Sequence, residues 1–120
     1  MCADRSQIEA FIEAGRKAAA MNLVQCSSGN LSWRIGPDTV LLSASRAWLG
    51  ELRDEQVAVC SIETGRCLNG KTPTCESGFH LGILKNRPAA SVVLHFQSPC
   101  ATAIACGRPA IAIPKSMLSV

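Results

Sequence analysis

Residues 31–42 read LSWRIGPDTVLL, and this stretch decides the class of fold. Apolar and polar side chains alternate over residues 31–35, as in a strand that buries one face. Residues 36–38, Gly-Pro-Asp, are typical of a turn, and residues 40–42 are again apolar. The sequence therefore predicts a β-hairpin here.

Helices are predicted on both sides of this hairpin along the chain. Ser6 and Glu9 have the spacing of a capping box, so a helix should begin near Ser6. Its apolar stripe continues to about Asn22, a residue that readily takes the left-handed cap position. The other expected elements are a short polar helix at 49–54, a strand at 57–62, a helix at 75–85, a buried central strand at 91–95, a helix at 99–106 and a strand at 110–113. This order predicts an α/β or α+β layered domain.

Composition predicts one globular domain over residues 1–120. The chain is 48% hydrophobic and 18% charged, which provides for a core and argues against disorder. The net charge of +3 is spread thinly and tyrosine is absent, so a nucleic-acid partner is not expected. The weak positive excess suits a small anionic ligand.

Location and redox state are also predicted from composition. No apolar stretch approaches the roughly 20 residues of a membrane span, and the N-terminus lacks the pattern of a secretory signal. We therefore expect a cytoplasmic protein without membrane contact. The seven cysteines include no C-x-x-C pair, which favours reduced, buried cysteines over a zinc knuckle.

Three segments are candidates for chemistry, and each has a plainer alternative. Residues 28–32 form a glycine-containing loop before a strand, where backbone can approach a ligand closely and Asn30 can hydrogen-bond. The alternative is an ordinary turn. Residues 73–76 open a helix, whose free N–H groups attract anions. There Thr74 either caps the helix or holds a phosphate oxygen, and Glu76 is equally explained as a favourable charge at the helix start.

The third segment is the strand end at His95. His95 and Gln97 should point to the same side of a strand, because strand side chains repeat every two residues. His95 is either a metal ligand or a core histidine with its ring satisfied. His80 follows Glu76 by four residues on one helix face and is able to pair with it, although a structural role for His80 is favoured.

Taken in order, these motifs resemble the class II aldolase/adducin family. The resemblance rests on Gly29-Asn30-Leu31-Ser32, the hydroxyl-bearing loop at 43–46, Pro73-Thr74-Cys75-Glu76, and a strand that ends His95-Phe96-Gln97-Ser98-Pro99, and it extends from about Ser6 to Val120. It implies a three-layer α/β/α fold around a mainly antiparallel or mixed sheet. Family members are longer, so the fold is expected to be shortened at its C-terminal end.

The resemblance also implies roles for individual residues. Glu76 matches the catalytic acid/base and His95 matches the first zinc ligand. Gln97 stands where a second ligand histidine belongs, although an amide oxygen is a poor zinc donor beside imidazole, and Glu76 is a further contributor to the metal. Positions that match phosphate-binding residues are Gly29, Asn30, Ser45, Arg46, Thr74 and Cys75. Arg46 replaces a family glycine and Cys75 replaces a family serine.

Two classes of function follow from the resemblance. The favoured one is lyase chemistry on a ketose phosphate, in which a divalent metal, zinc by expectation, stabilises an enediolate and Glu76 transfers the proton. The substrate is then a small phosphorylated sugar or aldehyde. The alternative is a non-catalytic assembly module like the adducin head, or an inactive truncated homologue. A homo-oligomer is expected in either case.

Overall fold

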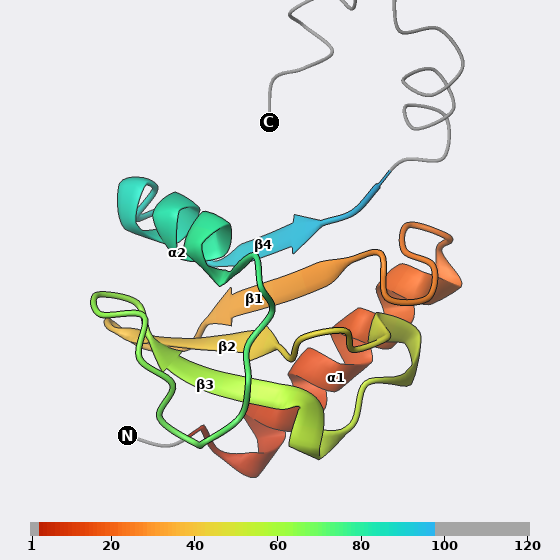
Figure 1. Cartoon of the computed structure of the whole chain (residues 1–120), viewed down its shortest axis with the longest axis horizontal. Coiled ribbons are helices and arrows are strands. Elements are labelled where there is room, and N and C mark those ends of the chain that lie inside the picture. Colours follow the sequence, from red (N-terminus) through yellow and green to blue (C-terminus); the bar gives the residue numbers. More distant parts are fainter. Residues whose placement is uncertain (1–2, 98–120) are drawn as a thin grey trace, which may run out of the picture.

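The computed structural model describes residues 3–97 (Figure 1). Its elements are the helices α1 (Arg5–Ala20) and α2 (Ser77–Asn86), the strands β1 (Asn30–Arg34), β2 (Thr39–Ser43), β3 (Val57–Ser61) and β4 (Val92–His95), and the 3₁₀ turns η1 (Leu49–Glu51) and η2 (Asp54–Gln56). The helix expected at 99–106 and the strand expected at 110–113 lie outside the described residues. Within residues 3–97, neither helix has the length and hydropathy that crossing a membrane requires.

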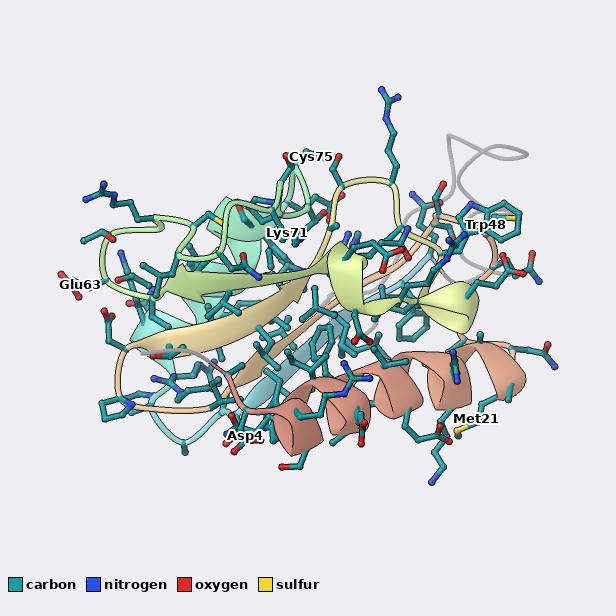
Figure 2. The ribbon with its side chains drawn as sticks, turned by 90° about the horizontal axis from the view of Figure 1, so that it is seen from below. Asp4, Met21, Trp48, Glu63, Lys71 and Cys75 are labelled. Atoms are coloured by element: carbon teal, nitrogen blue, oxygen red, sulfur yellow. The ribbon has the colours of Figure 1, made fainter. Side chains whose placement is uncertain are left out.

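The four strands form one sheet in the order β3-β2-β1-β4, and every neighbouring pair is antiparallel. Helix α1 packs on one face of this sheet and α2 on the other, so the described part of the chain has three layers (Figures 1 and 2). The predicted α/β/α fold and the predicted hairpin are both confirmed. β4 pairs only with β1 within the described residues, so the expected central strand is at an edge there.

Strand side chains alternate between two separate cores. Leu31, Leu41 and Val59 pack toward α1, whereas Val40 and Leu42 belong to the cluster under α2. The expectation that residues 31–35 bury only one face is wrong, because α2 covers the second face. Polar residues of β1 on that second face are therefore inside the protein.

Both helices begin at residues other than those predicted. The Asp4 carboxylate caps α1 by accepting from the Gln7 N–H at 2.9 Å, and the Gln7 side chain accepts from the Asp4 N–H. The capping box is therefore Asp4–Gln7 and not Ser6–Glu9. Ser6 donates to Asp4 instead, which lowers the pKa of that carboxyl group. Helix α2 begins at Ser77, two residues later than expected, and the polar helix expected at 49–54 is the two turns η1 and η2.

Two backbone positions near the predicted site have special requirements. A side chain at Gly29 would place its Cβ 2.4 Å from Val24 Cγ1 and 3.1 Å from the carbonyl oxygen of His95. Only glycine therefore lets this loop approach the end of β4. Arg46 has φ +63°, in the left-handed region that favours glycine, and its side chain is exposed. This conformation explains why a glycine suits the position that Arg46 occupies.

Gly29→Ala is expected to lower the free energy of unfolding by about 1–3 kcal/mol, because the new methyl group overpacks buried Val24. Gly36→Ala is the matched control, since its Cβ would have only ordinary contacts, 3.7 Å from Thr39. Its effect should stay within about 0.5 kcal/mol. Urea denaturation measures both, and equal effects of the two substitutions would contradict the packing described for Gly29.

Arg46→Gly is expected to stabilise the fold by up to about 1 kcal/mol, because it removes the cost of a left-handed arginine. Arg87 is an exposed arginine with φ −126°, so Arg87→Gly should destabilise by about 0.5–1 kcal/mol through backbone entropy alone. Thermal and urea unfolding measure whether the two substitutions change the free energy of unfolding in opposite directions. Destabilisation by both substitutions would show that Arg46 is not strained.

Candidate active site

Five polar side chains meet where β1 begins, β4 ends and α2 starts. Asn30 and Ser32 come from β1, His80 from α2, Glu76 from the position just before α2, and His95 from the last position of β4. The β1–β4 register pairs Asn30 directly with His95. Side chains opposite each other in an antiparallel pair share one face of the sheet, and here that face is the one under α2.

These side chains form one continuous series of contacts. Ser32 Oγ lies 2.7 Å from Nδ1 of His80, and the other ring nitrogen of His80 hydrogen-bonds to Oδ1 of Asn30. Asn30 Nδ2 donates to Oε2 of Glu76 at 3.3 Å. His95 Nδ1 lies 2.7 Å from the same carboxylate oxygen. That last contact has the distance of an ion pair but not the alignment of a hydrogen bond, and Nδ1 of His95 is buried without a hydrogen-bond partner among residues 3–97.

Solvent exposure increases along the series from Ser32 and His80 to Glu76 and His95. Ser32 and His80 are fully buried, while the side chains of Glu76 and His95 are 41% and 30% exposed. Burial lowers the pKa of the His80 imidazole to about 4, with a smaller contribution from His95, so this ring is neutral near pH 7. The Glu76 carboxylate is therefore accessible from solvent, while the Asn30 amide contacts it from the protein side.

The alternative pairing of the His80 side chain with Glu76 is absent among residues 3–97, and the structural role favoured from the sequence stays a prediction. Its ring contacts Ser32 and Asn30 and is not hydrogen-bonded to the Glu76 side chain. Ser32 belonged to the candidate segment 28–32, but its contact with His80 was not predicted. The available signal was the spacing of Asn30 and Ser32, which places two polar side chains on one face of a strand that flanks a histidine-bearing helix.

The loops predicted to bind phosphate lie beside one another. Two backbone hydrogen bonds of 3.0 Å join them, from the Ser45 N–H to the Thr72 carbonyl and from the Thr74 N–H to the Ser43 carbonyl. The Leu31 N–H donates to Ser43 Oγ at 3.0 Å, which ties the Gly29–Asn30 loop to the same place. The structure therefore gathers the three predicted phosphate segments at one end of the sheet.

Within these loops the side chains differ in what they offer a ligand. The Thr74 hydroxyl is buried and accepts from the Glu76 N–H at 3.3 Å, so it supports the start of α2. Ser45, Arg46 and Cys75 are exposed. Figure 2 shows Cys75 on the far side of the molecule from α1. An anion here would meet a guanidinium, a hydroxyl and a thiol from solvent.

The predicted metal ligands are only partly assembled. Glu76 and His95 are adjacent, and Gln97 lies two residues beyond the last position of β4. No group of three His, Cys, Asp or Glu side chains within residues 3–97 is arranged to hold a metal ion. A catalytic zinc takes three protein ligands. The described residues supply one imidazole and one carboxylate and therefore do not complete such a site.

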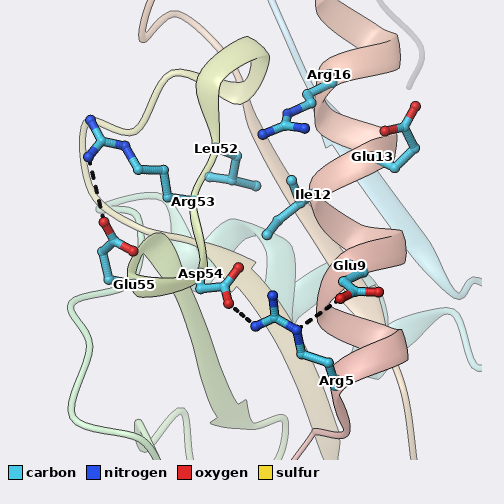
Figure 3. Close-up of a pocket in the computed structure, with 9 residues that line it drawn as sticks. All are labelled: Arg5, Glu9, Ile12, Glu13, Arg16, Leu52, Arg53, Asp54 and Glu55. Carbon is cyan, nitrogen blue, oxygen red and sulfur yellow. Dashed lines mark hydrogen bonds and ion pairs between the residues drawn. The ribbon is translucent and has the colours of Figure 1, made fainter.

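Away from these loops, a hollow of about 490 Å³ lies between α1 and residues 52–55 (Figure 3). It is lined by three arginines and four carboxylates, and Arg5 pairs with both Glu9 and Asp54. Because these charges neutralise one another across the hollow, it offers no net attraction to a phosphate. The end of the sheet near Glu76 is the better candidate.

Comparison with known proteins identifies the family of this chain. Residues 9–119 match the family described as Class II Aldolase and Adducin N-terminal domain. The chain is 37% identical over 92 residues to methylthioribulose-1-phosphate dehydratase of Methylococcus capsulatus, covering 77% of this chain and 45% of that protein. It is 32% identical over 103 residues to 3-oxo-tetronate 4-phosphate decarboxylase of Haemophilus influenzae, covering 86% of this chain and 49% of that protein.

The fold has the same relatives. An L-fuculose 1-phosphate aldolase structure superposes with a TM-score of 0.76 at 24% identity, over 88% of this chain and 50% of that one. The chain thus spans about half the length of the curated relatives it matches. With the three-layer sheet, the ordered motifs and the matched family in agreement, this chain belongs to the class II aldolase and adducin family.

Proposed function

We propose that this chain carries the phosphate-binding and proton-transferring part of a class II aldolase-type site that acts on a small phosphorylated sugar or aldehyde. The observation that carries the proposal is the Glu76 carboxylate, which Asn30 supports at 3.3 Å while the side chain stays 41% exposed. A general base must reach the proton it removes, and its position must be fixed. Glu76 meets both conditions.

The chemistry proposed for Glu76 is proton transfer next to a carbonyl group. Dehydration, decarboxylation and aldol cleavage, the reactions in the names of the similar proteins, all develop negative charge on a carbon beside a carbonyl. One carboxylate oxygen of Glu76 faces Asn30 and His95. The other oxygen is therefore the one we assign to the substrate proton, with an enediolate as the product of its removal.

The phosphate of the substrate is proposed to bind at the three gathered loops. Gly29 and Asn30 would offer close backbone approach, and Ser45 with Arg46 would offer a hydroxyl and a guanidinium able to form two parallel hydrogen bonds. The Thr74 hydroxyl and the Cys75 N–H would contribute donors just before α2, where the helix dipole favours an anion. Holding the phosphate fixes the reacting carbons relative to Glu76.

The metal proposal is narrower than the family resemblance implies. His95 is the described imidazole that would bind a divalent metal such as zinc, and Glu76 is the carboxylate beside it. A bound metal would supply Lewis-acid stabilisation of the developing charge. Because two groups fall short of a zinc site, the roles proposed for Glu76 and the phosphate loops do not depend on it. Gln97 is proposed only as a weak, neutral donor.

A non-catalytic role in assembly, as for the adducin head, is the second candidate. It is favoured by the missing ligand at Gln97 and by exposed apolar side chains at Phe79, Val92 and Phe96, on or beside α2 and β4. Exposed apolar area of this kind serves association. Self-association of the chain remains a prediction under both candidates.

Glu76→Gln is expected to reduce turnover of a ketose phosphate by about 100-fold or more, because the amide cannot accept the proton. Its thermal unfolding should stay close to that of the parent chain. The control is Glu63→Gln, an exposed carboxylate in the turn after β3, which should leave turnover unchanged. Aldehyde release measured with a coupled dehydrogenase reports the rates. Equal turnover by Glu76→Gln and the parent would remove Glu76 from the reaction.

Gln97→His is expected to tighten zinc binding about tenfold, a gain of about 1.4 kcal/mol, because it adds an imidazole two residues after His95. Arg87→His adds an exposed imidazole at the other end of α2 and serves as the control, with no change expected. Isothermal titration with zinc measures both. If Gln97→His binds zinc no better than the control, Gln97 does not occupy a ligand position.

A further inference from the structure

His80 is, with Ser32, a fully buried polar residue of the site, and both of its ring nitrogens are engaged. Nδ1 lies 2.7 Å from Ser32 Oγ and Nε2 hydrogen-bonds to Asn30 Oδ1. The ring is fully buried between α2 and β1. Burial makes a polar partner necessary for each ring nitrogen, and here those partners connect the ring to the Asn30 amide.

The hydrogen-bond directions follow from the chemistry of the partners. A carboxylate only accepts, so the Asn30 side chain must turn its NH₂ group toward Glu76 and its carbonyl oxygen toward His80. An amide carbonyl also only accepts, so Nε2 of His80 must carry the hydrogen. In a neutral ring Nδ1 is then an acceptor, and the Ser32 hydroxyl donates to it.

A doubly protonated ring does not fit this place. No carboxylate hydrogen-bonds to the His80 ring among residues 3–97, and the ring has no exposed surface. A cation buried without an anion in contact is strongly disfavoured. The neutral tautomer with its hydrogen on Nε2 is therefore the one that gives both His80 ring nitrogens and both polar groups of the Asn30 side chain a complementary partner.

We infer that His80 is a positioning residue whose neutral, Nε2-protonated ring fixes the orientation of the Asn30 amide and, through it, the Glu76 carboxylate. If the Asn30 amide flipped, its carbonyl oxygen would face the carboxylate and its NH₂ group would face the Nε2 hydrogen. Both contacts would be repulsive, so the ring selects one orientation. The consequence for turnover rests on the proposed function; the ring tautomer and the amide orientation do not.

Long-range ¹H–¹⁵N NMR on the parent chain tests the tautomer directly. We expect the His80 ring to carry hydrogen on Nε2 and a lone pair on Nδ1. The Asn30 side-chain NH₂ should give two separate signals that exchange slowly with water. A hydrogen on Nδ1, alone or together with one on Nε2, would overturn the inference. These readouts need no turnover, so a chain without activity would contradict the proposed function and leave them standing.

Substitutions at His80 test the link to Asn30. Glutamine keeps one donor and one acceptor, so His80→Gln should preserve the two Asn30 NH₂ signals, whereas His80→Leu should shift them and speed their exchange. Ser32→Ala removes only the far partner of the ring and should leave Asn30 as in the parent. Unchanged Asn30 signals in His80→Leu would overturn the inference. If His80→Leu does not fold, altered Asn30 signals in a folded His80→Gln would overturn it.

Kinetics provides a second readout if the parent chain turns over a ketose phosphate. A positioning role predicts that His80→Leu lowers kcat by about tenfold or more with little change in KM, and that His80→Gln restores much of the loss. A purely structural role would lower the amount of folded enzyme and leave kcat per folded molecule unchanged. That second result would overturn the inference.

Discussion

The antiparallel pairing of β1 with β4 is the constraint on which the rest of the site depends. It sets Asn30 opposite His95, residues that are 65 positions apart in the chain, and places both on the face under α2. A slip of one residue would turn these side chains to the α1 face and bring Leu31 and Leu94 in their place. Burying an imidazole and an amide in the apolar core on the α1 side would cost free energy, because neither would find a hydrogen-bond partner there. The two cores therefore determine the β1–β4 register, and the register determines which side chains meet at the site.

Burial changes along the face of α2 that covers this part of the sheet. Glu76, His80 and Leu84 are four residues apart and therefore lie on one face of the helix. Leu84 is fully buried in the core, His80 is buried in polar company, and Glu76 is at the rim. The apolar end of this face anchors the helix while its polar end points the carboxylate outward. Folding energy and site geometry thus come from different turns of one short helix.

Much of the fold could be predicted from the sequence because it rests on local pattern. The hairpin, the layered α/β class and the left-handed Asn22 follow from alternation, turn residues and helix ends, whereas the three layers were implied by the family resemblance. Local pattern does not determine the N-cap residue of α1, because Asp4 and Ser6 are both favoured at that position. Burial of the second face of β1 was likewise not predictable, because alternation shows which residues share a face but not whether a later helix covers that face.

The candidate site was predictable residue by residue and not as a network. Glu76, His95 and Asn30 each carried a signal of residue type and position, whereas the link through His80 to Ser32 exists only once β1 and α2 are packed together. Distances between elements are set by the whole core, so no short motif encodes them. The shared side expected for His95 and Gln97 stays a prediction, because β4 ends at His95.

The buried polar series bears on whether this domain is more than a scaffold. Replacing both partners of a buried hydrogen bond by apolar groups of similar shape is often neutral or stabilising, so a fold that needed only stability has no requirement for Ser32, His80 and Asn30 in its interior. Their bonds converge on a carboxylate that solvent reaches. Among residues 3–97 the metal side of the site, by contrast, offers one imidazole where a zinc enzyme needs more. The buried polar contacts to Glu76 therefore support the proposed proton transfer more strongly than the described residues support a metal site.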